Sequence, residues 1–280
     1  MRAGAQRIAE AFRHARDDGR AAFIPFLTAG DPDGDASEAL VLELARRGAD
    51  LVEMGIPFSD PVADGPVIQR ASRRALAGGF SLRRALDLAA RVRRAHPVPL
   101  VFMSYANPIL RFGAGAFAEA AAGAGVDGLI VPDLPPEEAG DLRSACSRHG
   151  IATIFLVAPT TTPGRLPAIC GAATGYIYYV ALRGVTGVRD ALPPDLAAGI
   201  ARVRAVTDLP VAVGFGVSTP EQVAAVAREA DGVIVGSALV RAVEGQVEAG
   251  AGRPELVARV GEAAAALRAA TGRAGAAGRA

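Results

Sequence analysis

Three acidic side chains in the segment 51–66 are the strongest candidates for chemistry in this chain. Glu53 interrupts a short apolar run that is typical of a β-strand, and Asp60 and Asp64 follow in a loop stiffened by prolines. A lone carboxylate in a strand that is buried on both faces is energetically unfavourable. The pattern favours a carboxylate held in a dry pocket for proton transfer, with a second acid supplied by the rigid loop. A solvated strand end is the simpler alternative.

Glycines gather at the ends of three later strand-like runs. Segments 214–216 (Gly-Phe-Gly) and 236–237 (Gly-Ser) close two of them, and segment 184–187 (Gly-Val-Thr-Gly) follows another. Glycine lets backbone amides approach an anion, and a helix that begins after segment 236–237 adds donors and a favourable dipole. Each segment alone is typical of an ordinary turn. Together they predict a phosphate site made mostly of main-chain donors.

A pocket of aromatic and apolar side chains is expected beside these polar groups. Its predicted members are Phe23, Tyr105, Tyr178 and Phe215, with Met103 and Ile130 closing it. Apolar walls of this kind suit a flat bicyclic ring. Ordinary barrel packing is the alternative explanation, above all for Phe23.

The residues that are missing exclude several kinds of chemistry. All 30 basic residues are arginine, so Schiff-base catalysis and covalent attachment of pyridoxal phosphate, which need a lysine amine, are not expected. His14, His96 and His149 lie near the expected ends of polar helices and do not cluster, so no metal site is predicted. Cys146 and Cys170 are expected to be reduced thiols in the core.

The bulk charge and hydropathy point to no extended surface partner. The net charge is +1, which gives no reason to expect nucleic acid or an anionic membrane. No apolar run approaches the length that spans a bilayer, and the first residues lack the apolar core of a signal peptide. We therefore expect a cytoplasmic protein.

Short apolar runs alternate with amphipathic segments along the chain. The runs expected to form strands are 23–27, 51–54, 100–103, 128–131, 153–157, 176–180, 211–214 and 232–235. Eight strands alternating with helices predict an α/β fold, a single (β/α)8 TIM barrel over residues 1–270. An open doubly wound sheet is the rival, but no Gly-x-Gly-x-x-Gly follows the first strand.

Three departures from the simple repeat are expected. One extra helix, over residues 6–17, precedes the first strand, and the region after Asp64 holds two helices that Gly78 and Gly79 separate. Residues 271–280 have no apolar face and are expected to be a disordered tail.

Motifs spread over nearly the whole chain resemble those of one known family. They are EMGIPFSDPVADGPVIQ at 53–69, FIPFLTAGDP at 23–32, YANP at 105–108, GVTG at 184–187, GFGVS at 214–218 and GSA at 236–238. Their order and spacing are similar to those of the tryptophan synthase alpha chain family. The resemblance implies a lyase that splits indole-3-glycerol phosphate into indole and glyceraldehyde 3-phosphate by retro-aldol cleavage.

The resemblance also implies roles for particular residues. Glu53 matches the family's catalytic acid and base, and Asp64 matches the residue that contacts the indole nitrogen. Tyr178 and Thr186 match positions that line the site, and the phosphate cradle is matched by Gly187, Gly216, Gly236 and Ser237. The chain departs from many relatives at Ala181-Leu182-Arg183. There Arg183 is expected to reach the phosphate, to pair with a loop carboxylate, or to point to solvent, and segment 183–193 is expected to be a mobile lid.

A partner is implied as well. This chain should hold no cofactor of its own. A β chain that carries pyridoxal phosphate should bind the rim around Phe58 and the expected loop 105–108, as an α2β2 heterotetramer. Three alternatives stay open. They are a free-standing lyase of the same fold, a non-catalytic regulatory subunit that binds the phosphate ligand, and another phosphate-binding barrel enzyme.

Overall fold

Eight parallel strands close into a barrel in the computed structural model, which describes residues 3–181, 195–214 and 216–273. The strands are β1 (Ala22–Thr28), β2 (Val52–Gly55), β3 (Leu100–Met103), β4 (Gly128–Ile130), β5 (Ala152–Val157), β6 (Ile177–Val180), β7 (Val211–Gly214) and β8 (Gly232–Val235). Each strand pairs with the next in sequence, and β8 returns to β1 with Phe23 opposite Val233. The predicted (β/α)8 TIM barrel is confirmed.

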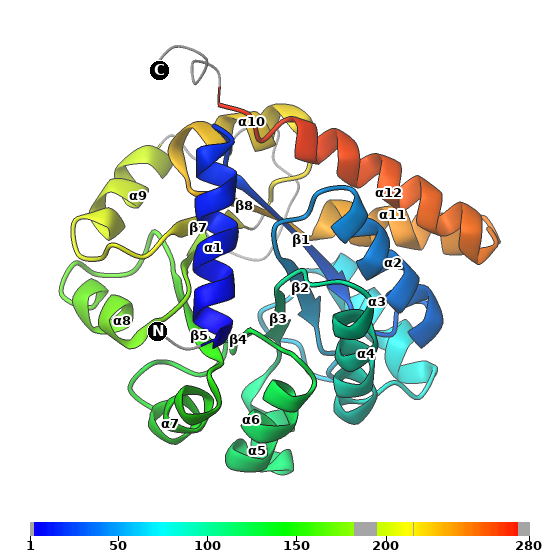
Figure 1. The fold of residues 1–280 in the computed structure, drawn as a ribbon, viewed down its shortest axis with the longest axis horizontal. Helices are drawn as coiled ribbons and strands as arrows, with labels where there is room; N and C mark the ends of the chain where they lie inside the picture. The colour runs from blue at the N-terminus through cyan, green and yellow to red at the C-terminus, as the bar shows by residue number, and fades with distance from the viewer. Residues whose placement is uncertain (1–2, 182–194, 215, 274–280) are drawn as a thin grey trace.

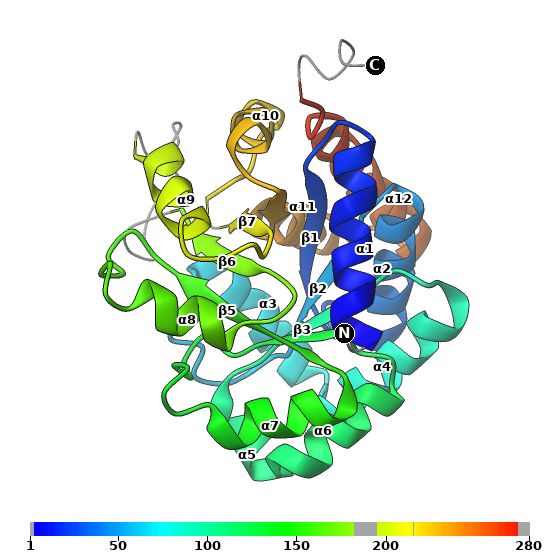
Figure 2. The same cartoon turned by 60° about the vertical axis from the view of Figure 1, so that its left-hand side comes forward.

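Most of the helices surround the barrel on its outer face (Figures 1 and 2). In the described residues the helices are α1 (Ala3–Asp17), α2 (Gly34–Arg46), α3 (Pro66–Ala77), α4 (Leu82–Ala95), α5 (Ala106–Phe112), α6 (Ala114–Gly123), α7 (Gly140–His149), α8 (Leu166–Ala172), α9 (Leu196–Arg204), α10 (Pro220–Glu229), α11 (Ser237–Glu248) and α12 (Arg253–Ala269). The extra helix before β1 and the helix pair after β2 agree with the prediction. Pairs also follow β3 and β8, which the sequence patterns did not indicate.

Local sequence signals explain where several helices begin. Asp33 accepts a hydrogen bond from the backbone N–H of Ala36 at 2.8 Å and so caps α2. Thr219 and Gln222 form a reciprocal capping box at the start of α10, where Pro220 occupies the first turn. Such caps satisfy amide groups that have no partner inside the helix.

The barrel interior is filled by alternate residues of the strands. Interior positions include Phe26 of β1, Val101 of β3 and Ile154 of β5, and Ile8 and Phe12 of α1 pack into the same cluster. Phe26 lies opposite Glu53 in the register of β1 and β2, so both side chains face inward. Helix α1 thus covers the amino-terminal end of the barrel, and the carboxyl-terminal end is left for the site.

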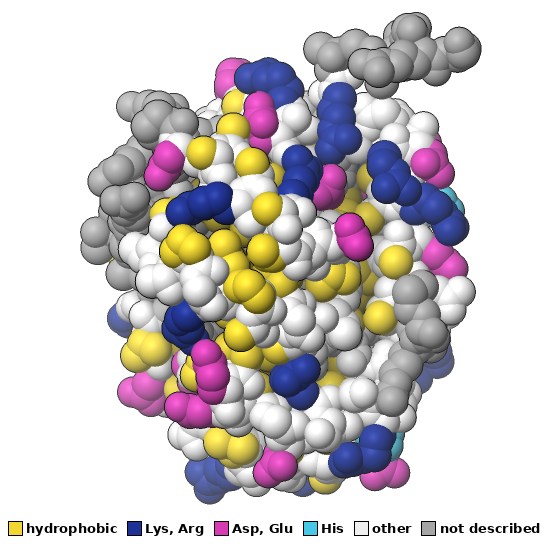
Figure 3. Space-filling view, turned by 90° about the vertical axis from the view of Figure 1, so that its left-hand side faces the viewer, with side chains coloured by type: hydrophobic (Ala, Val, Ile, Leu, Met, Phe, Trp, Pro, Cys, Tyr) yellow, Lys and Arg dark blue, Asp and Glu magenta, His cyan; other side chains and the backbone are white. Residues whose placement is uncertain are grey.

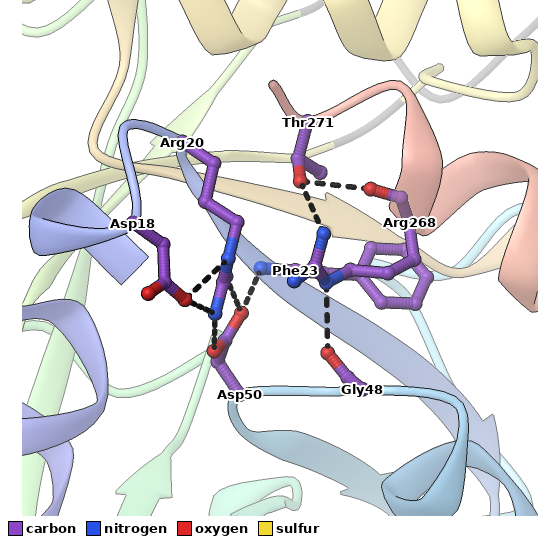
Figure 4. Close-up of polar contacts among 7 residues, drawn as sticks. All are labelled: Asp18, Arg20, Phe23, Gly48, Asp50, Arg268 and Thr271. Carbon is purple, nitrogen blue, oxygen red and sulfur yellow. Dashed lines mark hydrogen bonds and ion pairs between the residues drawn. The ribbon is translucent and has the colours of Figure 1, made fainter. Parts of the chain in front are cut away.

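An ion-pair network fastens the amino-terminal end of the barrel (Figure 4). The carboxylate of Asp50 accepts hydrogen bonds from Arg20 at 2.6 and 2.9 Å and from the backbone N–H of Phe23 at 2.8 Å. Arg268 at the end of α12 donates to the carbonyl of Gly48 at 3.1 Å. These contacts hold the segment that leads into β2, the strand of Glu53.

The start of the expected tail is part of the fold. Thr271 is fully buried, Gly272 forms an antiparallel bridge with Arg20, and Arg273 donates to the carbonyls of Ala227 and Ala230 at 2.9 and 2.7 Å. The expectation of disorder from residue 271 onward is therefore corrected for 271–273. These residues lack an apolar face, but hydrogen bonds to the barrel's end hold them. Residues 274–280 lie outside the described residues.

The surface shows no field of a single sign on the face seen in Figure 3. Small hydrophobic areas lie there among arginine and acidic side chains. None of the helices in the described part of the chain is both long and apolar enough to cross a membrane.

Candidate active site

Glu53 is an isolated acid inside the barrel. Its side chain is completely buried, and Tyr176 Oη donates a hydrogen bond to Glu53 Oε1 at 2.5 Å. Within the residues that the structure describes, Glu53 Oε2 has no hydrogen-bond partner. Burial raises the pKa of Glu53 from 4.5 to about 8, although the hydrogen bond from Tyr176 acts in the opposite direction. Glu53 is therefore mostly protonated at neutral pH and can give up a proton.

The raised pKa of Glu53 also couples its ionisation to folding. Between about pH 4.5 and about pH 8 the folded chain holds a proton on Glu53 that the unfolded chain has lost. Because the folded state binds more protons in this window, the contribution of Glu53 lowers stability as the pH rises. A group that weakens the fold in this way is a typical mark of a functional site.

Tyr176 fixes the orientation of the Glu53 carboxyl group. Its ring is fully buried and lies 5.5 Å from the ring of Phe12, measured between centroids. Burial, followed by the nearby charge of Glu53, raises the pKa of the Tyr176 phenol well above its usual value. The phenol thus stays protonated and keeps donating to Glu53.

Asp64 is held by the loop that follows β2. Its backbone N–H donates to the carbonyl of Pro61 at 3.0 Å, and its carbonyl accepts from Gln69 Nε2 at 2.9 Å. The hydroxyl of Tyr105 accepts from the backbone N–H of Ala63 at 3.0 Å. Burial raises the pKa of Asp64 to about 6, and a hydrogen bond from Tyr105 lowers it in part. Asp64 is therefore mostly ionised at neutral pH.

A small pocket opens at the carboxyl ends of β1, β2 and β3. It is lined by Phe26, Thr28, Gly55, Ile56, Asp64, Ile68, Ser72, Met103 and Tyr105. Gly55 is needed there, because a Cβ at this position would overlap the ring of Phe26. Four of the nine lining residues, Thr28, Asp64, Ser72 and Tyr105, carry a polar side-chain group, and the others are apolar or glycine. The pocket therefore places a carboxylate and hydroxyl groups beside apolar walls.

The structure brings most of the described pocket residues to the interior or its mouth. Tyr105 and Met103 line the pocket, and Tyr178 and Ile130 belong to the interior cluster. Gly214 makes room for Tyr178, since a Cβ on Gly214 would collide with the Tyr178 hydroxyl.

Phe23 is not brought to this pocket. Its side chain packs in the layer between the barrel and its helices, whereas Phe26 of the same strand faces the interior. Sequence reasoning missed Phe26. The available signal was strand alternation, which places residues 24, 26 and 28 on one face and residue 23 on the other.

The expected phosphate segments are only partly described. Gly216 has a φ of 87° just after β7, a conformation that favours glycine. Ser237 is the first residue of α11, and Gly236 is its N-cap. These groups lie after β7 and β8, where barrel enzymes commonly bind phosphate. Arg183, Thr186, Gly187 and Phe215 lie outside the described residues, as does the whole of the expected lid, 183–193.

A closed parallel barrel with a buried acid in its interior and a pocket at the carboxyl ends of its strands is characteristic of TIM-barrel enzymes. Comparison with known proteins narrows the class. Residues 12–270 match the family model described as tryptophan synthase alpha chain. The chain belongs to the tryptophan synthase alpha chain family, as its motifs predicted, and is thereby a lyase of tryptophan biosynthesis.

Individual relatives cover nearly all of the chain. It is 49% identical over 247 residues to the tryptophan synthase alpha chain of Geobacter sulfurreducens, covering 88% of this chain and 94% of the relative. The alpha chain of Acidiphilium cryptum is 50% identical over 266 residues, with 94% and 96% covered. The structure of Mycobacterium tuberculosis tryptophan synthase aligns with a TM-score of 0.84 at 44% identity, covering 93% of this chain and 98% of that chain. The tryptophan synthase alpha chain of Legionella pneumophila aligns with a TM-score of 0.87 at 38% identity, with 99% of each chain covered.

Proposed function

We propose that this chain cleaves indole-3-glycerol phosphate by a retro-aldol reaction, giving indole and glyceraldehyde 3-phosphate. The observation that carries the proposal is Glu53, a fully buried acid with a pKa of about 8 and one oxygen that has no partner in the described residues. General acid–base catalysis is most effective when the pKa of the catalytic group is near the working pH. Glu53 meets that condition.

The first step is protonation of the indole ring at C3. Indole cannot leave as a free C3 carbanion, so the neutral Glu53 carboxyl group first gives its proton to C3. Positive charge then develops at the ring nitrogen, which gains a double bond to C2. The Asp64 carboxylate, which lines the pocket, accepts the ring N–H and stabilises this charge.

The second step breaks the carbon–carbon bond. Glu53, now a carboxylate, removes the proton from the hydroxyl on the side-chain carbon attached to C3. The oxygen forms the aldehyde carbonyl as the bond to C3 breaks, and that electron pair returns to the ring and neutralises the nitrogen. Glu53 ends the cycle protonated, so it is regenerated without any cofactor in this chain.

The substrate phosphate is proposed to bind at the same mouth, after β7 and β8, the second of which pairs with β1. Gly216 and the amino-terminal turn of α11, with Gly236 and Ser237, offer backbone amides and a favourable helix dipole. Gly187 is proposed as a further donor. Main-chain donors suffice for a phosphate ester, so the absence of lysine is no obstacle.

A β chain that carries pyridoxal phosphate is the proposed partner, in an α2β2 assembly. Val62, in the loop after β2, is 75% exposed, and Leu110 of α5, after β3, is 61% exposed. Both belong to segments that follow the carboxyl ends of adjacent strands. The ring of Phe58 lies 5.4 Å from that of Tyr105, which braces the loop for docking. Exposed apolar side chains on a braced rim are typical of a protein interface.

The test measures indole release by the purified chain, alone and with a β chain from the same source. We expect slow release alone, faster release with the β chain, and co-elution on gel filtration. Leu110→Asp should weaken co-elution and activation while leaving the release by the isolated chain unchanged. Val206→Asp is the matched control, since Val206 is 40% exposed on the segment that precedes β7.

Three other outcomes would each favour a different interpretation. Release by the isolated chain without co-elution or acceleration would favour a free-standing lyase. Ligand binding with no release under any condition would favour a regulatory subunit. Leu110→Asp and Val206→Asp behaving alike would remove the docking surface proposed here.

A further inference from the structure

Two buried polar side-chain atoms have no hydrogen-bond partner among the residues that the structure describes. They are Oε2 of Glu53 and Oγ1 of Thr28. The Thr28 residue is only 3% exposed, so bulk water does not satisfy its hydroxyl. Native proteins pair the great majority of such groups, and an exception calls for an explanation. The proposed reaction uses Glu53 but gives Thr28 no task.

The two atoms belong to adjacent strands and face the same interior. Phe26 lies opposite Glu53 and Thr28 lies opposite Gly55 in the register of β1 and β2. Alternate residues share a face, so Thr28 stands one step nearer the mouth than Glu53, on the strand beside it. Thr28 also lines the pocket that contains Asp64. Thr28 therefore stands between the pocket that contains Asp64 and the level of Glu53 in the barrel.

The chemistry of the two unpaired atoms is complementary. After Glu53 has given its proton to C3, its carboxylate only accepts hydrogen bonds, whereas a threonine hydroxyl donates one and accepts others. A single ligand hydroxyl can satisfy both atoms at once, by donating its proton to Glu53 Oε2 and accepting from Thr28. The substrate hydroxyl that Glu53 deprotonates in the proposed reaction has this property.

We propose that Thr28 is a further substrate-contacting residue, whose hydroxyl donates a hydrogen bond to the oxygen of the substrate hydroxyl that Glu53 deprotonates. This inference rests on the proposed retro-aldol function. As the proton moves to Glu53, negative charge grows on that oxygen until the carbon–carbon bond breaks and the carbonyl forms. A hydrogen bond to this oxygen strengthens as the charge develops. Thr28 therefore lowers the activation barrier of the cleavage more than it tightens substrate binding.

The test replaces the hydroxyl by a methyl group of similar shape. Thr28→Val should lower kcat for indole release by about 10- to 100-fold, the range expected for one hydrogen bond to a charged group. Its Tm should be unchanged or higher, because the variant removes a buried polar atom that has no partner in the ligand-free chain. Thr28→Ser keeps the donor and should retain most of the activity.

The affinities for two ligands, one with the hydroxyl and one without it, test the proposed contact separately from catalysis. In a Glu53→Gln background, where cleavage is blocked, Thr28→Val should weaken binding of indole-3-glycerol phosphate. It should leave unchanged the affinity for indole-3-propyl phosphate, which has the same ring and phosphate but no hydroxyl. A merely structural role for Thr28 would change both affinities together.

Thr271→Val provides the matched control. Thr271 is also a buried threonine, but its hydroxyl donates to the carbonyl of Arg268 at 2.8 Å at the opposite end of the barrel. This variant should lower Tm and leave kcat near that of the wild type.

Two results would overturn the role of Thr28. One is full activity in Thr28→Val, and the other is a fall in Tm matched by equal losses of affinity for both ligands, as expected if the hydroxyl holds a structural water. If the wild type releases no indole, the proposed function fails, and the comparison of the two affinities still decides whether Thr28 contacts the hydroxyl.

Discussion

Replacing Glu53 by glutamine is expected to lower indole release by a factor of about 10² to 10⁴. The amide keeps the size of the side chain and still accepts a hydrogen bond from Tyr176, so the interior packing should survive. It cannot give a proton to C3 or take one from the hydroxyl. Steady-state release and single-turnover cleavage should fall together, while the affinity for indole-3-propyl phosphate changes little.

Glu229→Gln is the control for this substitution. Glu229 is an exposed glutamate at the end of α10, away from the barrel interior, and its replacement should leave kcat unchanged. A Glu53→Gln variant that keeps more than about a tenth of wild-type turnover would contradict the role of Glu53. Its loss of rate would then be smaller than the loss of about 10²-fold or more expected for a general acid–base group.

Asp64→Asn should reduce kcat on the order of 10²-fold, a loss typical of removing one preorganised electrostatic contact in a transition state. A neutral amide cannot balance the positive charge that grows on the ring nitrogen after C3 is protonated. The same reasoning predicts that kcat/KM of the wild type depends on pH, because burial raises the pKa of Asp64 to about 6. As the pH falls through about 6, Asp64 gains a proton and kcat/KM of the wild type should decline.

Asp60→Asn tests whether that effect is specific. Asp60 lies in the same loop but is exposed, and its carboxylate accepts from the neighbouring Ser59 hydroxyl at 2.5 Å. In the isolated chain this variant should keep most of the activity. If Asp64→Asn and Asp60→Asn lose activity equally, the loop rather than the charge of Asp64 is responsible.

The barrel itself could be predicted from the sequence because its strands are buried on both faces. A doubly buried parallel strand appears as a short apolar run, and the expected strands 100–103, 211–214 and 232–235 coincide with β3, β7 and β8. The glycine pair at 78–79 likewise marked the break between α3 and α4, which end and begin on either side of it.

Short or alanine-rich helices were not predicted from the sequence. The alanine-rich α6 has little amphipathic pattern, and α5 and α8 have seven residues each, too few for the periodicity to show. The region around Tyr105 was therefore expected to be a loop, whereas α5 begins directly after it and Tyr105 is its N-cap.

The two acids of the candidate site were predicted from the sequence, but the residues that contact them were not. Glu53 and Asp64 stood out because each is an acid in an unusual local setting. Tyr176 lies 123 residues from Glu53 in sequence, and only closure of the barrel brings the two together. The choice of Phe23 instead of Phe26 has a similar cause, since the inward face of β1 is fixed by its register with β2.

The most direct test of Glu53 as the group that protonates the ring is an NMR titration of its carboxyl carbon in the ligand-free chain. The wild-type protein is labelled at glutamate with carbon-13, and Glu53→Gln identifies the signal. We predict a midpoint near pH 8, as expected for a fully buried acid. Among the described residues, Tyr176 is its hydrogen-bond donor. A midpoint near the usual value of 4.5 would mean that Glu53 is ionised at neutral pH and cannot be the group that protonates the ring.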